Sequence, residues 1–203
     1  MFIIVEGPDW VGKTTITKGI KESLKDSFIP KVTTTREPGG TDLGNKIREI
    51  LFDIDQDIDP LAETLLFLAD RAQHIKKVIE KTPKDHLIIS DRYDLTTIVY
   101  QCKIKKAIDK HVLVKIEKML GFPQPDAAII LTAEEPLSSS VDEDTFMKKF
   151  DFSFKELNEI YRNKIPYSYP KLFINSSKTS IESSVNTSVD FIKRLFNKKN
   201  ISI

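Results

Sequence analysis

The segment Gly7-Pro8-Asp9-Trp10-Val11-Gly12-Lys13-Thr14 has the spacing of a phosphate-binding loop: glycine, four residues, glycine, lysine and a hydroxyl residue. The glycines let the backbone turn so that several N–H groups point at one anion, and the following helix adds its positive N-terminal end. Lys13 supplies a positive charge for the β- and γ-phosphates, and the Thr14 hydroxyl is a Mg²⁺ ligand. The loop predicts nucleotide binding, but it is shared by GTPases, motor ATPases and small-molecule kinases.

Arginine is scarce in this sequence, and two of the six arginines directly follow predicted strands. Arg36 lies in Thr35-Arg36-Glu37-Pro38-Gly39-Gly40-Thr41, and Arg92 lies in Asp91-Arg92-Tyr93. Because ligands bind beyond the carboxyl ends of the strands in an α/β sheet, both arginines should face the crevice that holds Lys13.

Three cations aimed at one cleft suit a reaction that spreads negative charge over a phosphoryl group in transfer. Arg92 is placed to bridge two phosphoryl groups, and Asp91 is placed to hold a Mg²⁺-bound water. Taken singly, each arginine is better interpreted as a surface ion-pair partner. Together, and beside the phosphate-binding loop, they favour a kinase.

The elements that must position these motifs alternate between strand and helix patterns. The predicted strands are 2–6, 31–35, 87–90, 127–132 and 171–174. The predicted helices are 14–24, 41–52, 60–81, 95–100, 109–120 and 180–196. In the third helix, Leu61, Leu65, Leu68 and Ala72 form an apolar stripe of the kind that faces a core. The alternation predicts one α/β domain over 1–203, with a mainly parallel five-stranded sheet flanked by helices and a short mobile lid near 134–152.

Composition excludes several other classes of protein. The chain has 203 residues, 40% of them hydrophobic, and a net charge of +1, so it exerts no general attraction on nucleic acid or anionic membrane. Cys102 is the only cysteine, which rules out an intramolecular disulfide, and no apolar run approaches the length of a membrane span. We expect a cytoplasmic enzyme, in host cytoplasm if the protein is viral.

Taken together, the phosphate-binding loop with Thr15, the segment 35–41, and Asp91-Arg92-Tyr93 with Tyr100-Gln101 resemble the thymidylate kinase family. The resemblance runs from Phe2 to about Ile130, and the segment 35–41 is its most specific part. It implies a P-loop kinase fold, the use of ATP and Mg²⁺, and phosphoryl transfer to dTMP for dTTP synthesis. It also implies a homodimer that acts on small molecules, without nucleic acid or membrane partners.

The resemblance assigns the phosphate-handling residues one by one. Asp9 matches the carboxylate that holds the sugar 3′-hydroxyl, Arg36 the arginine that grips the acceptor phosphate, and Arg92 the arginine between donor and acceptor. The expected catalytic set is Asp9, Lys13, Arg36, Asp91 and Arg92. The expected ATP site is Gly7, Pro8, Asp9, Trp10, Val11, Gly12, Lys13, Thr14 and Thr15, with Thr14 and Asp91 as metal ligands.

The resemblance also implies a base pocket. Phe67 matches the aromatic ring that stacks on thymine, and Arg71 matches an arginine beside the base and phosphate. Thr97 and Gln101 match contacts to the base edge, and Tyr100 matches the ring that crowds a ribose 2′-hydroxyl. From the residues alone these assignments are weaker, because Phe67 on a leucine-rich helix is more often part of a core.

Two features depart from the family pattern. Trp10 stands where members usually carry glycine or arginine, and no arginine occurs between Arg92 and Arg162 to serve as a lid arginine. The nearest cations are Lys148 and Lys149. We therefore expect slow turnover or an altered way of gripping phosphate. Two alternatives stay open: a broader deoxynucleoside monophosphate kinase acting on dUMP or dGMP, and a nucleotide-binding module with impaired catalysis.

Overall fold

Five parallel strands form the central sheet of the computed structural model, which describes residues 1–27, 29, 31–53, 57–137, 153–163 and 167–201. The strands are β1 (Phe2–Glu6), β2 (Val32–Arg36), β3 (Leu87–Asp91), β4 (Ala127–Thr132) and β5 (Lys171–Asn175). Their order across the sheet is β2-β3-β1-β4-β5, and every neighbouring pair is parallel. The predicted parallel five-stranded sheet is confirmed.

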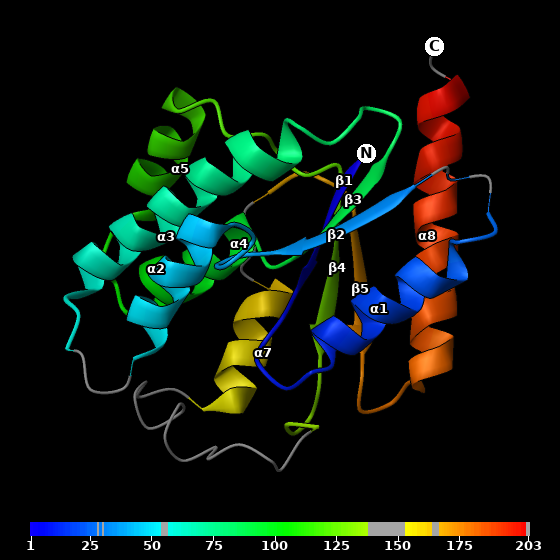
Figure 1. Cartoon of the computed structure of the whole chain (residues 1–203). Coiled ribbons are helices and arrows are strands. Elements are labelled where there is room, and N and C mark those ends of the chain that lie inside the picture. Colours follow the sequence, from blue (N-terminus) through cyan, green and yellow to red (C-terminus); the bar gives the residue numbers. More distant parts are fainter. Residues whose placement is uncertain (28, 30, 54–56, 138–152, 164–166, 202–203) are drawn as a thin grey trace.

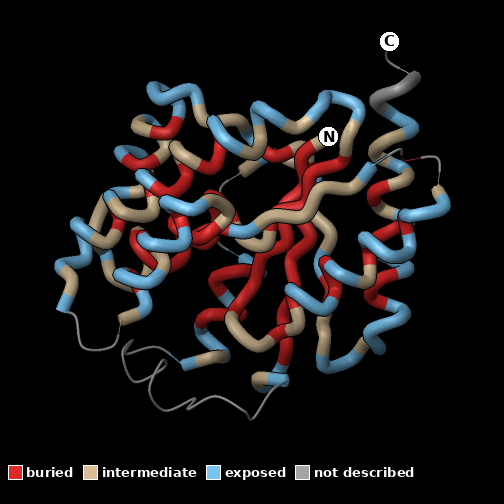
Figure 2. The backbone as a smooth tube through the Cα atoms, in the orientation of Figure 1, coloured by how far each residue is buried: buried red, intermediate tan, exposed pale blue. Residues whose placement is uncertain are grey.

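Both faces of the sheet are buried, which explains why β1 is a continuous apolar run rather than an alternating one. Ile3 and Val5 point into one hydrophobic cluster, and Phe2 and Ile4 point into another on the opposite face. Figure 2 shows this buried centre, with the exposed residues lying mostly on the outer sides of the helices and in the loops.

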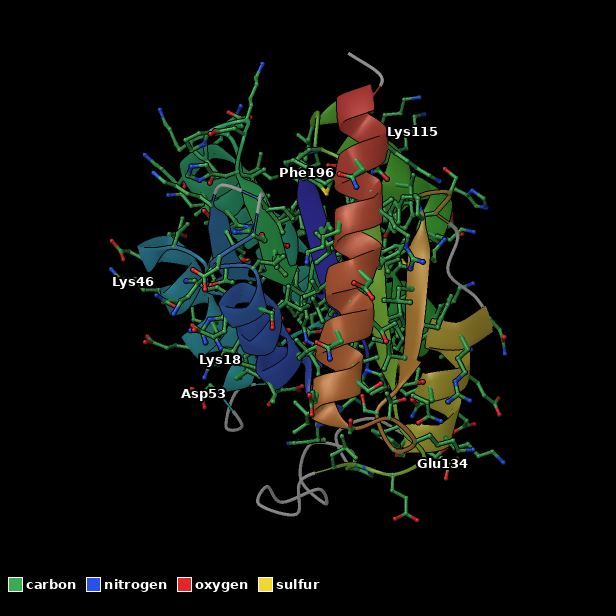
Figure 3. The ribbon with its side chains drawn as sticks, turned by 90° about the vertical axis from the view of Figure 1, so that its right-hand side faces the viewer. Lys18, Lys46, Asp53, Lys115, Glu134 and Phe196 are labelled. Carbon is green, nitrogen blue, oxygen red and sulfur yellow. The ribbon has the colours of Figure 1, made fainter. Side chains whose placement is uncertain are left out.

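Helices cover the two faces of the sheet. On one face, α1 (Lys13–Ser23) lies beside α8 (Ile181–Ile201), as Figures 1 and 3 show from two directions. The labelled Lys18 of α1 points to solvent in Figure 3. The other elements are α2 (Asp42–Phe52), α3 (Pro60–His74), η1 (Ile75–Ile79), α4 (Asp94–Thr97), η2 (Ile98–Ile104), α5 (Lys110–Met119) and α7 (Phe154–Asn163). No helix in these described ranges has the length and apolar character needed to cross a membrane.

Side-chain caps start three of the helices where the sequence predicts them. The Thr41 hydroxyl accepts a hydrogen bond from the Gly44 N–H at 3.0 Å and starts α2. Asp59 caps α3, with Pro60 in its first turn, and Asp109 caps α5. Two predicted helices end differently, because α3 continues into the π-helical turns of η1 and α4 continues into those of η2.

The expected apolar stripe of α3 is wrong at Leu61 and Leu65, although Leu68 is buried as predicted. Leu61 is 47% exposed and Leu65 is 55% exposed, whereas Thr64, Arg71 and His74 are buried. The helix turns a polar side inward because buried ionic partners lie beneath it. Helix α7 was not predicted, and α8 continues past 196 to Ile201. The expected lid near 134–152 falls mostly on 138–152, which lies outside the described residues.

The order of the strands decides where the motifs meet. The phosphate-binding loop follows β1, Arg36 ends β2, and Asp91 ends β3, and these are three neighbouring strands. In the register of the sheet, Asp91 pairs with Val5 on one side and with Arg36 on the other. The three motifs therefore lie together at the carboxyl ends of three neighbouring parallel strands.

Candidate active site

The phosphate-binding loop has the backbone geometry that its glycines predict. Gly7 has φ +144°, and a Cβ there would lie 2.1 Å from the Leu131 carbonyl oxygen. Gly12 has φ +88° and forms the N-cap of α1. Trp10 also has a positive φ, 59°, a conformation that a side chain disfavours by about 1–2 kcal/mol. This backbone explains why glycine suits position 10, and the tryptophan here accepts that strain.

A cavity of about 1620 Å³ opens at the carboxyl ends of β1, β2 and β3. Among its lining residues are the sequence-predicted Asp9, Trp10, Val11, Gly12, Lys13, Thr14, Thr15, Arg36, Phe67, Asp91, Arg92, Thr97, Tyr100 and Gln101. Gly7, Pro8 and Arg71 are not among the lining residues. The phosphate-binding loop, both arginine-bearing turns and the predicted base contacts thus meet in one space.

Arg92 connects the turn after β3 to the phosphate-binding loop. Its guanidinium donates to the Asp9 carboxylate, to the Gly7 carbonyl at 3.1 Å and to the Thr96 hydroxyl at 2.9 Å. Burial works against the charge, but Asp9 and neighbouring groups raise the pKa of Arg92 well above its usual range. Arg92 is therefore a permanently charged group held at the wall of the cavity.

Asp9 is ionised and shared among several donors. Burial alone would raise its pKa, but the charges of Arg92 and Lys13 and the hydrogen bonds it accepts lower the pKa below the usual value. The Tyr100 hydroxyl, 3.4 Å away, donates to the second carboxylate oxygen. Asp9 thus joins the phosphate-binding loop to the predicted base pocket.

Lys13 is 7% exposed, and its ammonium donates to the Pro8 carbonyl and lies 3.8 Å from Asp9. Burial, and then the charge of Arg92, lower the pKa of Lys13 to about 8, while Asp9 and Asp91 oppose that shift. The lysine is therefore the ionisable group of the loop whose charge changes just above neutral pH.

Thr14 and Asp91 come together as a pair of oxygen donors. The Thr14 hydroxyl, at the start of α1, donates to the Asp91 carboxylate at the end of β3 over 2.9 Å. In the described ranges no group of three or more His, Cys, Asp or Glu side chains could hold a metal ion alone. A hydroxyl with one carboxylate fits Mg²⁺, which takes few protein ligands and completes its shell with water and phosphate oxygens.

Arg48 is a further cation at the cavity, and the sequence analysis missed it. It donates to the Pro38 carbonyl at 3.2 Å, and its guanidinium lies 4.6 Å from the centre of the Phe52 ring. Burial, and then the charges of Arg36 and Arg92, lower its pKa. The available signal in the sequence was that arginine is rare in this chain and that Arg48 lies on the helix that follows the glycine-rich turn. In the structure, Asn45, three residues earlier on that helix, accepts a hydrogen bond from Arg36 at 3.4 Å.

Arg71 lies behind the cavity wall, in a buried network. It is 2% exposed and donates to Glu37 at 2.8 Å, to Glu117 at 2.6 Å, to the Tyr93 carbonyl at 2.7 Å and to Thr97 at 2.9 Å. The charges of both glutamates outweigh the cost of burial, so the pKa of Arg71 stays well above its usual range.

Two further α3 side chains hold the glycine-rich turn that follows β2. His74 lies between Glu37, at 2.6 Å, and the Thr35 hydroxyl, at 2.7 Å. Asp70 accepts a hydrogen bond from the Gly39 N–H at 3.1 Å, and burial raises its pKa to about 6. Because Glu37 directly follows Arg36, and Tyr93 directly follows Arg92, one side of α3 fixes both arginine-bearing turns.

Glu6 supports the same arrangement from β1 and was also missed. Its buried carboxylate accepts hydrogen bonds from the Tyr93 N–H at 2.8 Å and from the Thr96 hydroxyl at 2.6 Å. Burial raises its pKa despite the nearby charge of Arg92. A charged residue at the end of an otherwise apolar strand was the signal that could have found it.

Arg162, the first arginine after Arg92 in the sequence, does not contribute to the cavity. Arg162 donates to the Thr132 hydroxyl at 3.1 Å and is not among the lining residues. Lys148 and Lys149 lie outside the described residues. Glu134, labelled in Figure 3 beyond the end of β4, pairs with Lys178 at 2.6 Å.

Comparisons with known proteins agree with this geometry. The profile of the family described as Thymidylate kinase matches residues 5–187. A thymidylate kinase of Caldicellulosiruptor saccharolyticus is 34% identical over 175 residues, which cover 79% of this chain and 84% of that protein. One of Malacoplasma penetrans is 39% identical over 136 residues, 66% of this chain and 63% of that protein. The crystal structure of thymidylate kinase from Ehrlichia chaffeensis superposes with a TM-score of 0.69 at 27% identity, covering 95% of this chain and 98% of that one.

The Arg71 network yields a stability prediction. Arg71→Met leaves Glu37 and Glu117 buried without their cation, so the free energy of unfolding should fall by about 3–5 kcal/mol in urea denaturation. Lys76→Met is the control, because the Lys76–Glu80 pair is exposed and should change stability by less than about 1 kcal/mol. Equal effects of the two substitutions would contradict the role assigned to Arg71.

Proposed function

The chain belongs to the thymidylate kinase family, and we propose that its cavity transfers the γ-phosphoryl group of ATP to dTMP, giving ADP and dTDP. The observation that carries this proposal is the meeting of the phosphate-binding loop, Arg36 and Arg92 in one cavity, with Arg92 bonded to Asp9 of the loop. The two alternatives left open by the sequence are not favoured, because the relatives described above are all thymidylate kinases.

On this proposal catalysis is positioning and charge stabilisation, without a covalent enzyme intermediate. The backbone of the loop and Lys13 receive the triphosphate, and Arg36 with Arg48 receives the acceptor phosphate. Arg92, held between the Gly7 carbonyl of the loop and Thr96 of α4, faces the charge that develops on the phosphoryl group in transfer. Mg²⁺, held by Thr14 and Asp91, would neutralise charge on the phosphate oxygens.

The base and sugar contacts are part of the same proposal. Phe67 offers a ring from α3, and Thr97 and Gln101 offer polar groups from α4 and η2, all lining the cavity. Asp9 is placed to orient the sugar, and the Tyr100 ring beside it narrows the space available to a 2′-hydroxyl. Arg71 acts on these groups through Thr97 and the two turns.

A homodimer is proposed from the family and from the exposed apolar side chains of two adjacent helices. Leu43 and Ile50 of α2 are 45% and 40% exposed, and Leu61 and Leu65 of α3 are exposed as well. Covering these side chains with a second copy would remove apolar area from water. A cytoplasmic location, expected from the single cysteine, stays a prediction.

The function is tested by a coupled ADP-release assay with ATP and a panel of dTMP, dUMP, dCMP and dGMP. The wild-type protein should turn over dTMP best, and Arg92→Ala should lower kcat/KM for dTMP by about 10²–10³-fold. Arg162→Ala, a change away from the cavity, is the matched control and should retain activity. A wild-type protein that phosphorylates none of these monophosphates would refute the proposal.

The pKa of Lys13 predicts a pH profile. The charged ammonium is the active form, and its pKa of about 8 means that it loses its proton as pH rises through that value. We therefore expect kcat/KM, which reports the free enzyme, to fall between about pH 7 and about pH 9.5. The residual activity of Lys13→Arg should lack this fall because a guanidinium stays charged. A flat wild-type profile over that range would be inconsistent with a required Lys13 charge.

The dimer is tested by placing a charge on the exposed apolar surface of α3. Leu65→Glu should convert the dimer to a monomer in sedimentation velocity, because a carboxylate would be buried without a partner. Met119→Glu on α5, where the side chain is 77% exposed, is the control and should leave the dimer intact. A monomeric wild-type protein would refute the proposed assembly.

A further inference from the structure

An ion pair that no assigned role explains lines the part of the cavity between α3 and the end of η2. Glu63 of α3 and Lys105, which follows η2, form this pair, and both line the cavity. Their side chains are 13% and 16% exposed, respectively. We call Glu63 and Lys105 the distal ion pair. A charged pair withdrawn this far from solvent suggests a task beyond surface solubility.

The two members of the distal ion pair follow the predicted base contacts along their two segments. Glu63 precedes Phe67 by four residues on α3, and Lys105 follows Gln101 by four residues. On the α-helix α3, residues at this spacing lie on the same side, about 6 Å apart along the axis. On the other segment, Lys105 directly follows the π-helical turns of η2 that carry Gln101. The distal ion pair therefore lies past the base contacts rather than beside them.

Three side-chain contacts between α3 and the α4–η2 segment give the direction of the pocket, from its phosphate end to its far end. Nearest the arginine-bearing turns, Arg71 donates to Thr97 at 2.9 Å. Further along, the Thr64 hydroxyl lies 3.3 Å from the Gln101 side-chain oxygen. The Glu63–Lys105 contact is the next cross-link outward. These three links connect the same two segments in order, from the phosphate end to the far end.

We propose that the distal ion pair sets the depth of the acceptor-base pocket, so that a pyrimidine fits and a purine does not. The inference rests on the proposed function, since it concerns the monophosphate that accepts the phosphoryl group. A purine is one ring longer than a pyrimidine, so with its phosphate on the arginines its far ring would reach Glu63 and Lys105. Admitting it would separate two charges that lie largely out of water, and that separation is unfavourable.

The test compares dGMP with dTMP as acceptors in a double variant. Glu63→Ala with Lys105→Ala removes both charges together, so neither is left unpaired. The ratio of kcat/KM for dGMP to that for dTMP should rise about tenfold, mainly through a lower KM for dGMP. Lys76→Ala with Glu80→Ala removes an ion pair on the exposed surface and should leave the ratio at its wild-type value.

Two further variants separate the length of the pocket from general loosening. Glu63→Lys with Lys105→Glu reverses the ion pair and should keep the wild-type ratio. Glu63→Gln with Lys105→Met removes the charges with little change in size, and should raise the ratio by less than the alanine pair does. This milder variant also serves if the alanine pair does not fold.

The outcomes distinguish this inference from the kinase function itself. An unchanged ratio in a charge-removing variant that melts like the wild type would overturn the role of the distal ion pair. A wild-type enzyme that uses dGMP as well as dTMP would also overturn it, while leaving the kinase function in place. Failure of the wild type to phosphorylate dTMP would instead refute the proposed function.

Discussion

The buried guanidinium of Arg71 holds together the two turns on which the cavity depends. Arg36, Arg48, Arg92 and Lys13 carry like charges at one cavity, and like charges at close range repel each other. Such a cluster needs a rigid support and nearby negative charge. Arg71 supplies the support, because it bonds Glu37 next to Arg36 and the carbonyl of Tyr93 next to Arg92. The fixed separation of the two turns lets a donor and an acceptor phosphate meet one preformed set of cations.

The carboxylates that balance these cations are held in place by hydrogen bonds and ion pairs. Asp9 pairs with Arg92 and lies near Lys13, and Asp91 is bonded to Thr14. These carboxylates keep the cations together without occupying every donor that a phosphate would need. The lowered pKa of Lys13 shows that the balance is only partial, since burial and Arg92 outweigh the neighbouring carboxylates. A site balanced in this way favours the arrival of a polyanion.

The sequence predicted those parts of the site whose signals are local. The phosphate-binding loop, the strands and the capped starts of α2, α3 and α5 depend on patterns a few residues long, and all of them are present. Glu6 escaped notice because the groups that bond its carboxylate, Tyr93 and Thr96, lie 87 and 90 residues away along the chain. Arg48 escaped notice because a single arginine on a predicted helix is more often a surface ion-pair partner. Arg71 was expected to meet substrate, yet its donors go to groups 22 to 46 residues away along the chain. No local pattern encodes partners at such separations.

The inward polar side of α3 and its outward leucines are two consequences of one rotation of the helix. To reach both arginine-bearing turns, α3 must direct Arg71 and His74 toward the sheet, and this places Leu61 and Leu65 on the opposite side. A monomer would then leave two leucines about half exposed to water, and each would forgo about 1 kcal/mol of burial free energy. A second copy packed on α2 and α3 would recover part of that free energy and would hold α3 against the turns. On this view the proposed dimer and the spacing of the catalytic arginines are linked through a single helix.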